Sequence, residues 1–78
     1  MIQISVTVSW GENFTPASLM YRYAKHTPGV THYNSHWGNA RLIIKGKHYE
    51  YHHLSITAEN GTDVVTLYLE EVKSNERV

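Results

Sequence analysis

The chain has 78 residues, of which 41% are hydrophobic and none is cysteine. This length forms one small domain, and the lack of cysteine excludes disulfide frameworks, thiolate metal sites and cysteine nucleophiles. The formal net charge is zero, but residues 1–50 carry five basic and two acidic side chains, whereas residues 51–78 carry two basic and five acidic ones. No basic start precedes an apolar run, and no window approaches a membrane span. We therefore expect a cytoplasmic protein with no membrane partner.

The first predicted element is a β-strand near the amino terminus. Apolar and polar residues alternate from Ile2 to Trp10, which is the two-residue period of a half-buried strand. Residues 11–13, Gly-Glu-Asn, then break the pattern.

A short helix is predicted next. Thr15 and Pro16 are typical of an N-cap followed by the first helical position. Leu19, Met20, Tyr23 and Ala24 fall on one face at helical spacing. The amphipathic helix is expected to run to about His26, and residues 27–29, Thr-Pro-Gly, end it.

Residues 29–40 form a stretch without a clean period. Whether residues 30–33 form a short edge strand stays open. The stretch contains His32, Tyr33, His36 and Trp37. A long aromatic loop in so small a domain is either functional or packed down by its own rings, and for Trp37 both alternatives remain.

A hairpin is predicted between residues 41–45 and 47–52, with its turn at Gly46. Either centring of the turn gives the same parity, so Leu42 and Ile44 share a face with Tyr49 and Tyr51. The rings of Tyr49 and Tyr51 are therefore expected in the core. The other face carries Arg41, Ile43, His48, Glu50 and His52.

The second half of the chain contains a change of phase. Leu54 and Ile56 have the opposite parity to Tyr49 and Tyr51, and a bulge at residues 52–53 would resolve this conflict. The dipeptide Asn60-Gly61 is a strong hairpin signal. A turn centred there pairs Ile56 with Val65 and Leu54 with Leu67, and it places His53 opposite Tyr68.

The predicted fold is α+β. Residues 1–72 form a single domain, a mostly antiparallel sheet of four to five strands in the order β-α-(β)-β-β-β, with one amphipathic helix packed on one face. Residues 73–78 are expected to be a flexible polar tail. One helix cannot cover both faces of a sheet, so the other face is predicted to meet solvent or a partner.

All six histidines lie between residues 26 and 53, which raises the question of metal binding. On a strand, His48 and Glu50 could chelate one ion. No thiolate or His-Glu-x-x-His helix supports such a site, so we predict no metal and no cofactor.

A metal-independent ribonuclease is one alternative function. Cleavage through the RNA 2′-hydroxyl needs a base, an acid and a cation, and Glu50, His48 or His52, and Arg41 share one predicted face. The same residues are also compatible with an ordinary cross-strand ion pair. Because no nucleophile motif or phosphate loop is present, the sequence does not decide whether the chain is an enzyme and favours a non-catalytic role.

Protein recognition is the function that the sequence favours. Tyrosine, tryptophan and arginine dominate binding hot spots, and a self-contained chain of this size is typical of small inhibitors or adaptors from phages and other mobile elements. Nucleic-acid binding is the alternative, weakened by a pI near 7.0. A homodimer through the uncovered sheet face or the edge of the first strand is a further alternative. The predicted partner-binding residues are His32, Tyr33, His36, Trp37, Arg41, Ile43, His48, Glu50 and Tyr68.

Overall fold

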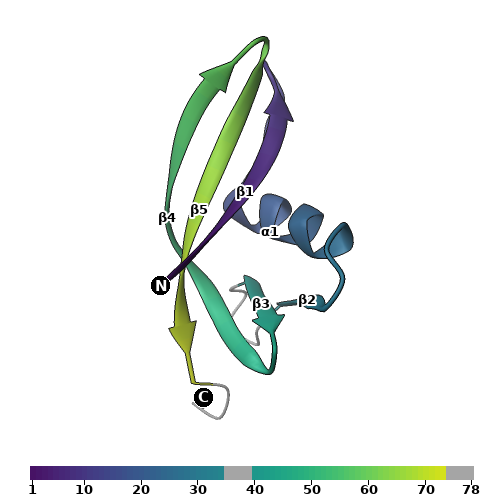
Figure 1. The fold of residues 1–78 in the computed structure, drawn as a ribbon, viewed down its shortest axis with the longest axis vertical. Coiled ribbons are helices and arrows are strands. Elements are labelled where there is room, and N and C mark those ends of the chain that lie inside the picture. Colours follow the sequence, from purple (N-terminus) through teal and green to yellow (C-terminus); the bar gives the residue numbers. More distant parts are fainter. Residues whose placement is uncertain (35–39, 74–78) are drawn as a thin grey trace.

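The computed structural model describes residues 1–34 and 40–73. These ranges contain one helix and five strands (Figure 1). The strands form a single sheet in the order β1-β5-β4-β3-β2, and every neighbouring pair is antiparallel. This confirms the predicted α+β fold with one helix. The elements are β1 (Ile2–Ser9), α1 (Pro16–Lys25), β2 (Val30–Asn34), β3 (Ala40–Ile44), β4 (Lys47–Glu59) and β5 (Thr62–Val72).

The segment that the sequence left open is an edge strand, β2, paired with β3. His36 and Trp37, two of the predicted partner-binding residues, lie outside the described residues. The predicted polar tail also lies outside them from residue 74 onward.

The start of α1 is fixed by the local sequence, as predicted. Thr15 is the N-cap, and its side chain accepts a hydrogen bond from the Ser18 backbone N–H at 3.1 Å. The Ser18 hydroxyl in turn accepts from the Thr15 backbone N–H at 3.0 Å. This reciprocal pair satisfies two N–H groups that a helix start otherwise leaves unbonded. Pro16 occupies the first turn, where its missing N–H is not needed.

The helix lies against the concave side of a curled sheet. It contacts both edge strands, β1 and β2, as well as β3 and β4 (Figure 1). The outer end of the β4-β5 hairpin extends beyond the helix in the same view. One face of the sheet is therefore covered over only part of its length.

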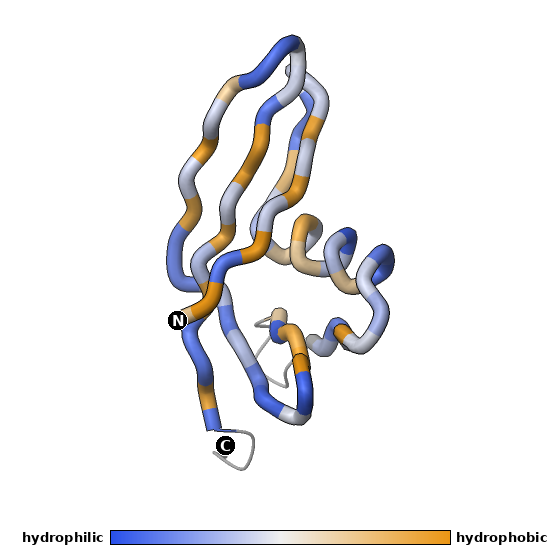
Figure 2. The backbone as a smooth tube through the Cα atoms, viewed as in Figure 1, coloured by the Kyte–Doolittle hydropathy of each residue, from blue (hydrophilic) through white to orange (hydrophobic). Residues whose placement is uncertain are grey.

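The core lies between α1 and this covered face. Leu19 and Met20 of the helix are completely buried, as are Leu42, Leu67 and Leu69 of the sheet. Apolar and polar residues alternate along much of the strands (Figure 2), so most of the apolar residues share the face toward the helix. The remaining buried residues are Ile4, Val6, Val8, Tyr49 and Val65.

The first strand ends one residue earlier than its apolar pattern. Trp10 was predicted to continue the buried face of the strand, but its side chain is 64% exposed. The chain turns here because the Glu12 backbone N–H donates to the Ser9 carbonyl, and Gly11 adopts a φ of 81°, a conformation that glycine tolerates best. A local turn therefore overrides the sequence alternation at Trp10.

The predicted register of the Asn60-Gly61 hairpin is confirmed, and the Gly46 turn, whose centring the sequence left open, is centred on Lys45-Gly46. Both hairpin turns have two successive residues with positive φ, Lys45-Gly46 and Asn60-Gly61, as type I′ turns require. Ile56 pairs with Val65, and Leu54 with Leu67. The register of the β4-β5 pair shifts between Tyr51 and His53, so the predicted bulge is present, with His52 as the extra residue.

The two tyrosines before the bulge differ in burial. Tyr49 is 9% exposed and belongs to the core, as predicted. Tyr51 is 38% exposed, so the prediction that its ring lies in the core is wrong. Tyr51 is on the same side of the sheet, but α1 contacts β4 much less than β2 and β3, and the ring stays partly uncovered.

An ion pair fastens the helix to the end of β1. Arg22 of α1 binds the Glu12 carboxylate and also donates to the Thr7 backbone carbonyl at 3.1 Å. The Glu12 carboxylate accepts a further bond from the Ser9 backbone N–H at 3.0 Å. These bonds stabilise the charged carboxylate, and the Arg22 hydrogen bond contributes most to a pKa of Glu12 below its usual value of 4.5.

This lowered pKa predicts an acid-sensitive contribution to stability. A carboxyl group with a lowered folded-state pKa stabilises the fold above pH 4.5, and the contribution is lost as the pH falls through the folded-state pKa. We expect the difference in unfolding free energy between wild type and Glu12→Gln to shrink between pH 7 and pH 3, as measured by urea denaturation. Glu59→Gln, at the exposed end of β4, is the control. A Glu12→Gln difference that stays constant with pH would contradict the prediction.

Candidate functional site

The sheet face away from α1 is not covered by any helix or strand of the described residues. We call it the open face. Its side chains follow from the strand registers together with the alternation of buried residues. It comprises Gln3, Ser5, Thr7, Thr31, Tyr33, Arg41, Ile43, His48, Glu50, His53, Ser55, Thr57, Val64, Thr66, Tyr68, Glu70 and Val72.

Four of the predicted site residues form one cluster on this face, which we call the Arg41 cluster. Arg41 and Glu50 are direct cross-strand partners, and the Arg41 Nε donates to the Glu50 carboxylate at 2.8 Å. The Arg41 Nη1 lies 3.4 Å from His48 Nδ1. The Tyr33 ring meets the His48 ring edge to face at 6.4 Å. The cluster thus links β2, β3 and β4.

The central ion pair of the Arg41 cluster is partly buried. The Arg41 and Glu50 side chains are only 15% and 22% exposed. Water and salt therefore screen their attraction less than they would for a fully exposed pair. Because a guanidinium has only donors, its contact with His48 requires Nδ1 of that ring to accept. A hydrogen bond here therefore corresponds to the tautomer of His48 that carries its hydrogen on Nε2.

Glu70 adds a second carboxylate to the cluster, and it was not among the predicted site residues. It lies directly opposite Glu50 on β5. Like charges at this position repel each other, and the Arg41 guanidinium offsets this repulsion. The predicted register, with the bulge counted, already contained the signal: one extra residue in β4 places Glu70 across from Glu50.

A second group of side chains lies at the bulge. His53 and Tyr68 are cross-strand partners, and their rings stack at 4.4 Å with an interplanar angle of 5°. The neighbouring His52 approaches His53 so closely that their Nδ1 atoms are 2.8 Å apart. A regular strand sends successive side chains to opposite faces. The bulge is what allows the two rings to meet.

The structure places His32 away from the other predicted residues. It lies on the helix side of β2, where its ring meets Tyr21 of α1 edge to face at 5.3 Å. Its Nε2 is buried and has no hydrogen-bond partner among the described residues. Ile43 and Tyr68 are on the open face with the Arg41 cluster. His36 and Trp37 lie outside the described residues.

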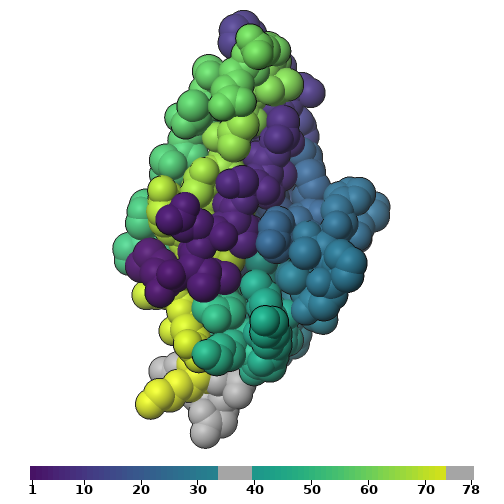
Figure 3. Space-filling view, viewed as in Figure 1, coloured from purple at the N-terminus to yellow at the C-terminus, as the bar shows by residue number. Residues whose placement is uncertain are grey.

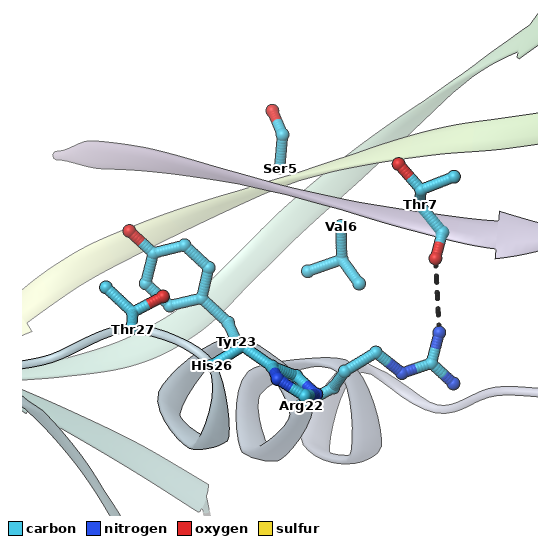
Figure 4. Close-up of a pocket in the computed structure, with 7 residues that line it drawn as sticks. All are labelled: Ser5, Val6, Thr7, Arg22, Tyr23, His26 and Thr27. Atoms are coloured by element: carbon cyan, nitrogen blue, oxygen red, sulfur yellow. Dashed lines mark hydrogen bonds between the residues drawn. The ribbon is translucent and has the colours of Figure 1, made fainter.

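A shallow pocket of about 270 Å³ lies between β1 and α1. Figure 4 shows Tyr23, His26 and Arg22 along the helix, with Val6 of β1 turned toward them and Ser5 and Thr7 turned away. β1 itself lies at the front of Figure 3, with the helix to its right. The Arg22 bond to the Thr7 carbonyl occupies part of the free edge of β1, which limits pairing with another strand there.

The described parts of the chain, residues 1–34 and 40–73, contain no helix long and apolar enough to cross a membrane. Within the same residues no three His, Cys, Asp or Glu side chains are grouped so as to hold a metal ion. Comparison of the chain with profiles of protein families, with curated proteins and with solved structures found no match.

Proposed function

We propose that this chain is a small protein-binding module, an inhibitor or adaptor of the kind that phages and other mobile elements encode, acting in the cytoplasm. It covers a surface on a larger protein with its open face. The observation that carries the proposal is the hydrogen-bonded Arg41 cluster on a sheet face that α1 leaves uncovered. Side chains already fixed in place lose little conformational entropy on binding.

The composition of the open face also favours a protein partner. Tyrosine and arginine are enriched in the buried centres of protein interfaces, and Tyr33, Arg41 and Tyr68 provide them here. Ile43 supplies an apolar surface between Thr31 and His48, its two cross-strand partners. His36 and Trp37 stay predicted contributors from the segment between β2 and β3.

Nucleic-acid binding, with metal-independent RNA cleavage as its catalytic form, is the second candidate. It is favoured by the contact of Arg41 with both Glu50 and His48, which joins a cation, a base and an acid. The charge of the surface opposes it. Arg41 is already paired, and Glu50 and Glu70 face each other beside it, so a phosphate backbone would meet two carboxylates at this point. We therefore rank it below protein binding.

Two exposed tyrosines provide a matched test of the proposal. Tyr33 is 45% exposed on the open face and Tyr21 is 53% exposed on the helix, and each meets one histidine edge to face. A stoichiometric partner isolated from the native host should bind Tyr33→Ala at least about tenfold more weakly than wild type, as for a hot-spot tyrosine. Tyr21→Ala should bind as wild type does. Titration calorimetry gives both dissociation constants.

Three results would overturn the proposal. The first is equal weakening by both tyrosine variants, and the second is unchanged binding by Tyr33→Ala together with Tyr68→Ala. The third is cleavage of labelled RNA by the wild type that is lost in Glu50→Gln and His48→Ala, because this would select the second candidate.

A further inference from the structure

The two consecutive histidines at the bulge place a pair of ring nitrogens at one point of the surface. Nδ1 of His52 and Nδ1 of His53 are 2.8 Å apart, and the ring planes are inclined by 77°. Both residues are exposed. In the absence of another ligand the contact is a hydrogen bond, in which one Nδ1 carries the proton and the other accepts it.

We propose that His52 and His53 form a binding site for a divalent late-transition-metal ion, with Cu²⁺ as the ion that fits best. Neutral imidazole is a ligand that zinc, copper and nickel share. When both Nδ1 atoms bind the metal through their lone pairs, the proton that one of them carried moves to Nε2 of the same ring. Water completes the coordination, since the described side chains supply no third ligand.

The choice of metal follows from the ligand type and the usual coordination geometry of each ion. The observed 2.8 Å is the length of the hydrogen bond between the two rings, and it changes when the rings turn toward an ion. Tetragonal geometry is typical of Cu²⁺ and Ni²⁺, whereas zinc prefers a tetrahedron. The general order of stability also places Cu²⁺ above Ni²⁺ and Zn²⁺.

The surrounding fold holds one ligand and leaves the other adjustable. His53 is stacked on Tyr68 of β5 at 4.4 Å, which fixes the plane of its ring. His52 is the unpaired residue of the bulge, so its ring is free to turn through the small angle that the metal requires. His48 takes no part in this site, because its Nδ1 already contacts Arg41.

The test is titration of the purified chain with Cu²⁺, and separately with Zn²⁺, in wild type and single-histidine variants. Calorimetry gives the affinity, and electron paramagnetic resonance counts the nitrogen ligands on Cu²⁺. We expect one tightest site with two imidazole nitrogens, and tighter binding of Cu²⁺ than of Zn²⁺. His52→Ala and His53→Ala should each weaken it at least about tenfold, since changes even outside the ligand shell commonly weaken metal sites by that factor.

His26→Ala and His48→Ala are the controls and should leave the site unchanged. The proposal is overturned if His52→Ala and His53→Ala both bind Cu²⁺ as wild type does, or if a control variant loses the site instead. Unfolding curves of the variants verify that each remains folded. This site does not depend on the proposed protein-binding function, and its test needs no partner.

Discussion

Replacing Leu67 by alanine is expected to unfold much of the protein population at room temperature. Leu67 is completely buried in β5, between its cross-strand partners Ile4 and Leu54. Removing a buried leucine side chain lowers the free energy of unfolding by about 2–5 kcal/mol, through lost transfer energy and the cavity that remains. One small core supplies only about 3–5 kcal/mol, so most of the stability is removed.

Urea denaturation followed by circular dichroism measures this loss. Ile56→Ala is the matched control, because Ile56 lies on the same strand pair but is 50% exposed, and we expect a loss of less than about 1 kcal/mol. Similar midpoints for Leu67→Ala and wild type would refute the central position that we assign to Leu67.

Two single-residue deletions in β4 are expected to have opposite outcomes. Deleting His52 removes only the extra residue of the bulge, and Tyr51, His53 and Leu54 then continue in the register that they already have against β5. Deleting Ser55 moves the strand by one residue, and a one-residue slip turns every side chain to the other face. Leu54 and Ile56 could then not both keep their partners, Leu67 and Val65.

We therefore expect the chain without His52 to fold and the chain without Ser55 to lose cooperative unfolding. Nuclear magnetic resonance spectra and thermal denaturation distinguish the two states. The contrary result, a folded Ser55 deletion with native chemical-shift dispersion, would mean that the hairpin register is less strictly specified than the pairing of Leu54 with Leu67 implies.

The fold was predictable where two independent signals agreed. The Asn60-Gly61 turn and the positions of Leu54 and Ile56 indicated the same register, and the structure confirms it. The bulge followed from the conflict of phase between Tyr51 and Leu54. On the open face, the Gly46 turn predicted that Arg41 and Glu50 share a face, and the structure makes them direct cross-strand partners.

The remaining features depended on what lies around a residue. The sequence could not show that Tyr51 is only partly covered, because this depends on how far a ten-residue helix extends across the sheet. The sequence assigned His32 and Tyr33 to one site. In the structure they are successive residues of β2, so their side chains lie on opposite faces of the sheet. Residues 29–40 show no regular alternation of apolar and polar residues. The strand β2 could therefore not be assigned from the sequence, and neither could the face on which the rings of His32 and Tyr33 lie.

The order of the strands also determines when the protein can fold as it is synthesised. Among the described strands, β1 has β5 as its only neighbour in the sheet, and its partners are Thr62–Leu69. Until these residues have left the ribosome, the apolar face of β1 has no strand beside it, and an exposed apolar strand is prone to aggregate. Contacts between distant segments also form slowly. A nascent chain that stops before residue 62 should therefore depend on ribosome-associated chaperones, and completing β5 should release it from them.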